Sequence, residues 1–328
     1  MKFSEVNAVK YYLAVDCGGS KIASLIFDES LKIHTKTEFS GGANAKTLPP
    51  DVLCENIKNA LCDVKRCAGG KKIEKIYGFF MHNEGLFERF GGEILNCPDV
   101  CVVSEGALGV LCGGIYPNGA LLLSGTGGDV FVIKDGNVAD IIGGYGAILG
   151  EKGSGFAIGK AAINAAIAYY EGTGPYTVLY DCVKEKYPAD TFRQSVYGIY
   201  RAPETVRAVA SFAIDVERAA EKGDGAALQI LDTAAKDLSD MVIAAYKKNG
   251  LPDDFPLTFS GSVMKHDISR EKPLMFDKIC AHLEKCGIKN INTPLVKPVY
   301  GAVLYYAYTQ NMAVDREKIK EYFSDLQG

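Results

Sequence analysis

Apolar and polar residues alternate near the start of the chain in the way that is typical of short β-strands. The runs at residues 11–16, 22–28 and 32–39 are separated by short connections that contain Gly, Ser or Asp. Connections of this kind join neighbouring antiparallel strands. The pattern therefore predicts an antiparallel meander of three strands.

Helical spacing follows the meander. Apolar residues recur at a helical period after Pro50, and the pair at Gly69 ends the pattern. Strand-like runs come next, at residues 76–81 and 100–103, and a helix is predicted from Glu105 onward. A meander, a helix and two further strands thus make up the first part of the chain.

The strand pattern then restarts at residues 120–123, 129–133 and 138–142. From Gly153 the chain turns mainly helical, and later segments predict one more strand and three more helices. These segments are residues 257–259 for the strand, and residues 276–283, 299–310 and 315–326 for the helices. We interpret the restart as the beginning of a second lobe.

The restart defines the expected domains. We place an N-terminal lobe at residues 1–116, rejoined by the C-terminal helix at residues 314–328, and a C-terminal lobe with a helical insertion at residues 117–313. The length of 328 residues is enough for two lobes, each with its own core. Because no flexible tract separates them, we expect a hinge between packed lobes.

The charge of the chain argues against large anionic partners. The net charge of −4 comes from 36 basic and 40 acidic residues without long like-charged runs, which predicts no nucleic-acid or membrane partner. No segment has the roughly 20 apolar residues of a membrane span. Residues 1–10 lack the apolar core of a signal peptide. We therefore expect a cytoplasmic protein with a small-molecule partner, and a homodimer stays an open alternative.

The metal-binding residue types are dispersed. Ten cysteines are scattered along the chain without a CxxC pair, and the four histidines lie far apart in sequence. This pattern favours reduced cysteines over a disulfide scaffold and gives no support for a zinc site.

Two glycine-rich turns each join a pair of predicted strands. The first comprises Asp16, Cys17, Gly18, Gly19, Ser20 and Lys21; the second comprises Ser124, Gly125, Thr126, Gly127, Gly128 and Asp129. Adjacent glycines let backbone N–H groups approach a phosphate without obstruction by Cβ. The alternative for either turn alone is a tight hairpin in which glycine only supplies a positive φ. Two such turns, each opening a lobe, favour a phosphate site, where Asp16 would hold Mg²⁺ directly or through water.

A third glycine-containing element ends the late strand. Gly261 and Ser262 follow Phe259 immediately before a predicted helix. Glycine at this position permits close approach of a flat adenine or ribose. Taken alone, the segment is also compatible with an ordinary strand-to-helix turn.

These three elements, in this order, resemble the superfamily that contains actin, the heat-shock chaperone ATPases and hexokinase. Within it, the chain looks most like the N-acetylglucosamine kinase family, which includes the activator ATPases of CoA-ester dehydratases and reductases. The residues that carry the resemblance are 13–21, 122–128, 143–146, 149–155 and 259–263. The resemblance covers nearly the whole chain. It implies an α/β fold of two ribonuclease-H-like lobes, of the actin and hexokinase type, with an interlobe cleft.

The resemblance also implies roles for individual residues. It places the ATP phosphates, with Mg²⁺, at Asp16, Gly18, Gly19, Ser20, Lys21, Ser124, Gly125, Thr126 and Gly127, and adenosine at Gly261 and Ser262. It places the sugar at Asn44, His82, Thr126, Gly144, Tyr145 and Glu151, and the catalytic base at Glu105.

Three positions depart from the family pattern. The family usually has aspartate where this chain has Glu105 and Glu151, and a small residue pair near His82. Glu105 and Glu151 each also have a simpler explanation, because an acidic residue near a helix N-terminus interacts favourably with the helix dipole without any catalytic duty. Asn44 in isolation would be a turn residue. The departures leave the identity of the acceptor open.

The family resemblance implies three possible functions. The first is an Mg-ATP-dependent kinase that phosphorylates an amino sugar at O6: N-acetylglucosamine, or alternatively N-acetylmuramic acid or glucosamine. The second is an activator ATPase of a CoA-ester dehydratase or reductase, which would need an iron–sulfur cluster at Cys101 and Cys112. The third is a catalytically idle sugar-sensing protein of the same fold.

Overall fold

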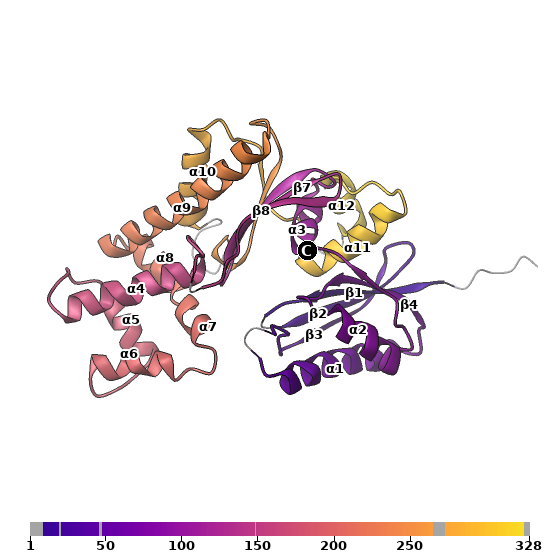
Figure 1. The fold of residues 1–328 in the computed structure, drawn as a ribbon, viewed down its shortest axis with the longest axis horizontal. Coiled ribbons are helices and arrows are strands. Elements are labelled where there is room, and N and C mark those ends of the chain that lie inside the picture. Colours follow the sequence, from indigo (N-terminus) through magenta and orange to yellow (C-terminus); the bar gives the residue numbers. More distant parts are fainter. Residues whose placement is uncertain (1–8, 20, 46–47, 148, 265–272, 325–328) are drawn as a thin grey trace, which may run out of the picture. The chain divides into compact units, whose positions relative to one another are not determined.

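The computed structural model describes residues 9–324, apart from residues 20, 46–47, 148 and 265–272. The chain forms two compact units. The first unit comprises residues 1–117 and 294–328, and the second unit comprises residues 118–293. Each unit contains one five-stranded sheet (Figure 1).

The first sheet begins with the meander that the sequence predicts. Its strands are β1 Tyr11–Cys17, β2 Ile22–Asp28, β3 Ile33–Phe39, β4 Ile73–Phe79 and β5 Val100–Val102, in the spatial order β3-β2-β1-β4-β5. The first three are antiparallel, whereas β4 and β5 run parallel to β1. Because Cys17 lies opposite Ile22, the turn between them projects from the carboxyl end of β1.

Helices cover both faces of this sheet. They are α1 Pro50–Cys67, α2 Glu84–Phe90, the short π-helix η1 Gly91–Leu95, α3 Glu105–Gly113, α11 Pro298–Thr309 and α12 Arg316–Tyr322. Leu13 and Val15 pack with the buried face of α1, and the intervening Ala14 packs with α3 and α11. This alternation is the period-two pattern of a strand buried on both sides.

Helix α11 belongs to the first unit, whereas the sequence pattern predicted that residues 294–313 lie in the second lobe. Almost every side of this helix is buried, and it approaches α3 so closely that a Cβ on Gly301 would lie 2.9 Å from the Leu108 carbonyl oxygen. A helix that is apolar all round carries no stripe that indicates which sheet it covers. Hydrophobic periodicity therefore could not assign α11 to either sheet.

The second sheet repeats the connectivity of the first. Its strands are β6 Gly119–Ser124, β7 Gly128–Lys134, β8 Asn137–Gly143, β9 Leu257–Ser260 and β10 Ile291–Asn292, in the order β10-β9-β6-β7-β8. Again an antiparallel meander is followed by two parallel strands. Two sheets with this shared order confirm the predicted α/β class with two ribonuclease-H-like units.

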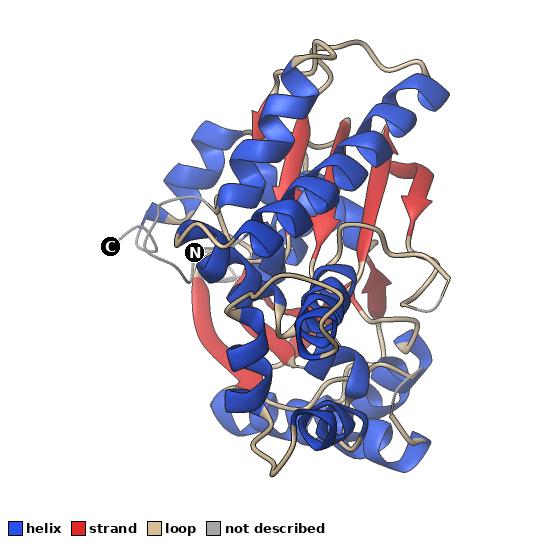
Figure 2. Ribbon diagram, turned by 90° about the vertical axis from the view of Figure 1, so that its left-hand side faces the viewer, coloured by secondary structure: helices blue, strands red, loops and turns tan. Residues whose placement is uncertain are grey.

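Most of the second unit outside its sheet is helical (Figure 2). The helices are α4 Gly155–Tyr170, α5 Leu179–Lys186, α6 Phe192–Tyr200, α7 Thr205–Ala210, α8 Ala213–Glu221, α9 Gly225–Asn249 and α10 Leu274–Glu284, with a short 3-10 turn, η2 Ser262–Met264. One core joins Ala120 and Leu122 of β6 to the buried faces of α4 and α9. Among the described residues, no helix combines the length and apolar character of a membrane span.

The long helix α9 is fixed at its start by Asp224. One carboxylate oxygen accepts hydrogen bonds from the Ala227 N–H and from Thr177 Oγ1, both at 3.0 Å, and the other accepts from the Val178 N–H at 2.9 Å. The side chain therefore caps α9 and also ties it to the segment before α5.

Replacing this cap should destabilise the second unit. Asp224→Ala leaves three donors without their acceptor, so we expect the free energy of unfolding to fall by about 1–3 kcal/mol in denaturant titrations. Asp190→Ala, at an exposed position between α5 and α6, is the matched control and should change it by less than about 0.5 kcal/mol. Equal stability of the two variants would contradict the role of Asp224.

Candidate active site

In the first unit, the glycine turn after β1 is hydrogen-bonded to the segment that carries Asn44. The Gly18 N–H donates to the Lys21 carbonyl at 2.9 Å, and the Gly18 carbonyl accepts from the Ala43 N–H at 3.0 Å. A Cβ on Gly19 would lie 3.9 Å from Nδ2 of Asn44. The structure thus brings this turn and Asn44 together, while Ser20 lies outside the described residues.

A buried asparagine holds the Asn44 segment in place. Nδ2 of Asn83 donates to the carbonyl oxygens of Ala43 at 2.8 Å, and of Phe80 and Met81 at 3.0 Å. The neighbouring His82, which the family resemblance assigns to the sugar site, has an exposed side chain in this turn. Strand β4 ends at Phe79, before the predicted end at residue 81, because Met81 and His82 adopt left-handed φ values of 52° and 62°.

Two acidic side chains of the first unit lie at the ends of regular elements. Asp16 is the penultimate residue of β1 and is half-buried. Burial, and then the charge of Asp16, raise the pKa of the Cys17 thiol to about 12, so this thiol stays protonated at neutral pH. Glu105 is the first residue of α3, whose cap is Ser104, with Oγ accepting from the Ala107 N–H at 3.2 Å.

Asp16 alone offers too few ligands to hold Mg²⁺, but it suits an ion that is also bound to the phosphates of a nucleotide. The described residues contain no group of three or more His, Cys, Asp or Glu side chains suited to a metal ion. Mg²⁺ commonly uses one or two carboxylates, several waters and substrate phosphates. Lys21 forms an exposed ion pair with Glu38 of β3, at 2.6 Å, so the donors nearest to this turn are mainly backbone groups.

In the second unit, the glycine turn after β6 is bonded to the segment that precedes α4. Ser124 is fully buried, and its Oγ donates to the Gly153 carbonyl at 3.1 Å. The Gly155 N–H donates to the Gly125 carbonyl at 2.7 Å, and the Phe156 N–H donates to the Thr126 carbonyl at 3.2 Å. Turn and segment therefore form one bonded structure.

The third predicted element packs on the same turn. Gly261 has a φ of 105°, and a Cβ on it would lie 2.1 Å from the Ser124 carbonyl oxygen, so only glycine fits there. A Cβ on Gly125 would lie 3.7 Å from Oγ of Ser262. The residues predicted for adenosine and those predicted for phosphate thus lie side by side in this unit.

The sugar residues predicted in the second unit also gather at the turn. A Cβ on Gly127 would lie 2.7 Å from Oε2 of Glu151. The Gly144 N–H donates to the Gly128 carbonyl at 3.3 Å. The side chain of Thr126 is exposed, and the ring of Tyr145 is 75% exposed, so both are accessible to a ligand.

One acidic residue at the end of the second glycine-rich turn was given no role from the sequence. Asp129, in β7, has a carboxylate oxygen that is buried without a hydrogen-bond partner in the described part of the chain. A Cβ on Gly144 would lie 3.2 Å from its other oxygen. Burial, and then the charge of Glu151, raise the pKa of Asp129 to about 7. The sequence does contain a signal for this residue, because Asp129 is an acidic residue at the start of an otherwise apolar strand.

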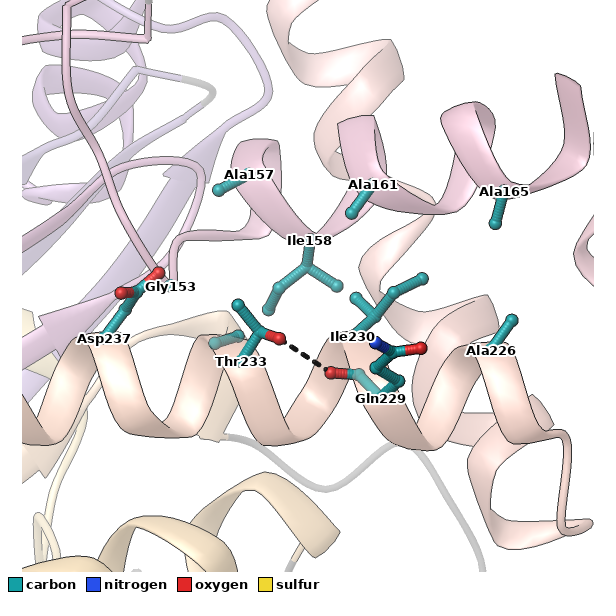
Figure 3. A pocket seen from close by; sticks show the side chains of 11 residues that line it. Gly153, Ala157, Ile158, Ala161, Ala165, Ala226, Gln229, Ile230, Thr233 and Asp237 are labelled. Carbon is teal, nitrogen blue, oxygen red and sulfur yellow. Dashed lines mark hydrogen bonds between the residues drawn. The ribbon is translucent and has the colours of Figure 1, made fainter. Parts of the chain in front are cut away.

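A separate cavity of about 310 Å³ lies between α4 and α9 (Figure 3). Its lining is mostly alanine and other small or apolar side chains, including Ala157, Ala161 and Ala234. Gly153 is the one predicted motif residue that borders it, and a Cβ on Gly153 would lie 2.4 Å from Cγ of Leu238. The cavity therefore borders the segment that carries Glu151 only at Gly153. None of the polar residues predicted for the phosphates or the sugar lines it.

Cys101 and Cys112 are poorly placed for a shared iron–sulfur cluster. Cys112 is 2% exposed, and its Sγ lies 3.6 Å from the Lys297 carbonyl, inside the contact of α3 with the start of α11. Cys101 is half-buried in β5. Cluster ligands shared between subunits must be accessible at the surface, which Cys112 is not.

The chain is similar to known proteins. A model of the BadF/BadG/BcrA/BcrD ATPase family matches residues 13–306. An N-acetylmuramic acid/N-acetylglucosamine kinase of Clostridium acetobutylicum is 26% identical over 246 residues, covering 70% of this chain and 77% of the relative. An N-acetyl-D-glucosamine kinase of Dictyostelium discoideum is 24% identical over 275 residues, covering 76% and 84%.

The fold is also shared with solved structures. A Porphyromonas gingivalis protein described as a candidate N-acetylglucosamine kinase superposes with a TM-score of 0.69. The sequences are 19% identical, and the match covers 92% of this chain and 100% of that protein.

The raised pKa of Asp129 predicts a pH-dependent stability. Between about pH 4 and pH 7, the unfolded chain releases this proton while the folded protein retains it, so the free energy of unfolding decreases across that window. Asp129→Asn removes this titration. The free energy of unfolding of Asp129→Asn minus that of wild type should therefore increase by about 1–4 kcal/mol from pH 4 to pH 8.

Denaturant titrations at several pH values measure this difference. Asp190→Asn changes an exposed carboxylate of the same unit and should keep the wild-type pH profile. A constant difference between Asp129→Asn and wild type across the window would show that the pKa of Asp129 is not raised.

Proposed function

The chain belongs to the BadF/BadG/BcrA/BcrD ATPase family, and from this premise we propose that it is an ATP-dependent kinase that phosphorylates N-acetylglucosamine, or a related amino sugar, at O6. One observation carries the proposal. In each unit, a glycine turn after the first strand is bonded to a segment with a polar side chain suited to sugar hydroxyls, Asn44 in one and Glu151 in the other. The two kinases among its relatives act on such sugars.

The first unit would supply phosphate donors, the metal ligand and the base. The turn from Gly18 to Lys21 would bind phosphate oxygens through its backbone N–H groups other than that of Gly18, which donates to the Lys21 carbonyl. Asp16 would hold Mg²⁺, which neutralises charge on the phosphates when it is bound. Asn44 would bind the sugar, with His82 at the edge of that site.

The second unit would supply the remaining phosphate donors and the adenosine site. The residues from Ser124 to Gly127 would contact the phosphates, and Gly261 with Ser262 would border adenosine. Glu151, Gly144 and Tyr145 would contact the sugar, with Thr126 near both ligands. Use of ATP agrees with the cytoplasmic location that the sequence predicts.

The reaction needs one proton acceptor. The sugar O6 attacks the γ-phosphorus, the bond to the bridging oxygen breaks and ADP leaves, while the hydroxyl proton passes to Glu105. Positioning and charge neutralisation provide most of the acceleration in phosphoryl transfer. Glu105 is the first residue of α3, so its carboxylate lies near the positive end of that helix.

The activator ATPase is the less favoured alternative, because Cys112 is buried. A catalytically idle sugar sensor differs from a kinase by the absence of turnover. An ADP-release assay across N-acetylglucosamine, glucosamine, N-acetylmuramic acid and glucose tests all three. A kinase shows acceptor-dependent release, an activator shows release that ignores the sugar, and a sensor shows none.

The first glycine turn can be tested without disturbing the fold. A Cβ on Gly19 has no neighbour closer than 3.9 Å. Gly19→Ala should therefore fold normally but obstruct phosphate, raising the dissociation constant of ATP about tenfold or more in calorimetry, which is about 1.4 kcal/mol. Gly85→Ala on α2, where a Cβ meets nothing within 4 Å, is the control. Unchanged affinity in Gly19→Ala would remove this turn from the nucleotide site.

Loss of the base should lower kcat specifically. Glu105→Gln keeps the shape of the side chain, so we expect kcat to fall about 10²-fold or more with little change in the sugar KM. Glu84→Gln is a matched control, because Glu84 is likewise the first residue of its helix, α2. A near-normal kcat for Glu105→Gln would assign the base to another residue, with Glu151 as the next candidate.

A further inference from the structure

The segment that carries Asn44 has an irregular backbone that is nevertheless buried in part. Gly42 and Ala43 are both buried, and residues 41–44 belong to no strand or helix. Buried backbone groups need hydrogen-bond partners. In this segment the partners must therefore come from other parts of the first unit rather than from a ladder or a helix.

Helix α1 supplies one of these partners. Nδ2 of Asn56, in the second turn of α1, donates to the Gly42 carbonyl at 2.8 Å. A Cβ on Gly41 would lie 2.7 Å from Cγ and Oδ1 of Asn56, so the lack of a side chain at Gly41 makes room for this amide. The Asn56 side chain is partly buried, and a hydrogen bond shielded from water is electrostatically stronger than one in solvent.

The hydrogen bonding continues from Gly42 to the first glycine turn. The Gly42 carbonyl shares one planar peptide group with the Ala43 N–H, which donates to the Gly18 carbonyl at 3.0 Å. The Gly18 carbonyl in turn shares a peptide group with the Gly19 N–H. Because the two groups of a trans peptide point in opposite directions, the bond to Ala43 fixes the direction of the Gly19 N–H. Two peptide groups thus connect Asn56 to a backbone donor of the turn.

Asn83 holds the next peptide group of the same segment. Its Nδ2 donates to the Ala43 carbonyl at 2.8 Å, in the peptide group that also contains the Asn44 N–H. Asn83 is buried at the end of the turn after β4. Two amide side chains therefore hold two consecutive peptide groups, and the group held by Asn56 is the one that continues to Gly18.

We propose that Asn56 is a positioning residue for both ligands: through the Gly42–Ala43 peptide it orients the glycine turn for phosphate, and through the same segment it orients Asn44 for the sugar. This inference rests on the proposed function and adds to it a residue outside the ligand contacts. Its consequence is that ATP binding depends on Asn56 even when no sugar is present.

The test measures two dissociation constants by calorimetry on the purified protein, one for ATP alone and one for N-acetylglucosamine alone. Asn56→Ala removes the donor to Gly42, so we expect both constants to rise about three- to tenfold, the usual scale for one hydrogen bond. Asn59→Ala, at an exposed position of the same helix, is the matched control and should leave both unchanged. A merely structural role would lower the fraction of folded protein and leave both constants unchanged.

A rise in the sugar constant alone would mean that Asn56 supports only the Asn44 segment, and a rise in the ATP constant alone would mean that it supports only the turn. Either result, or no change in both, would overturn the inference and leave the proposed function intact. If Asn56→Ala does not fold, Asn56→Ser, whose hydroxyl is too short to reach Gly42, is measured in its place. A wild-type protein that binds ATP but neither binds nor phosphorylates an amino sugar would overturn the proposed function and the sugar role of Asn56. The ATP constant of Asn56→Ala would then still decide its role at the turn.

Discussion

In the second unit, the candidate site depends on two segments that pack very close to the backbone at the end of β6. Gly261 lies so near Ser124 that a Cβ would come within 2.1 Å of its carbonyl oxygen. On another side, Gly155 donates to the Gly125 carbonyl at 2.7 Å. Side chains would keep these backbones apart, so glycine is what allows three segments from distant parts of the sequence to meet around one turn.

In the first unit, a buried polar side chain holds the segment that contacts the glycine turn. Its turn after β1 is joined to the Asn44 segment by a backbone bond to Ala43, and buried Asn83 holds that segment from behind. A buried amide with all its donors engaged is costly to displace. It therefore gives Asn44 a defined position, which a loop residue otherwise lacks.

Both units place acidic groups among their candidate functional residues. Asp16 and Glu105 lie in the first unit, and Asp129 and Glu151 lie in the second. Phosphoryl transfer to a hydroxyl requires a metal ligand, a proton acceptor and hydrogen-bond acceptors for the sugar, and carboxylates can fill each of these roles.

The sequence alone determined the strands of both meanders, the buried face of α9 and the glycine turns, because each depends on local periodicity or on residues that are adjacent in the chain. It also carried the family resemblance, since the motifs are contiguous. The assignment of α11 to the first unit, the anchoring by Asn83 and the exposed state of His82 came only with the tertiary structure. The interaction of Asp129 with Glu151 did as well, because two residues separated by a strand and a loop become neighbours only when the backbone folds, and only then does burial change their pKa.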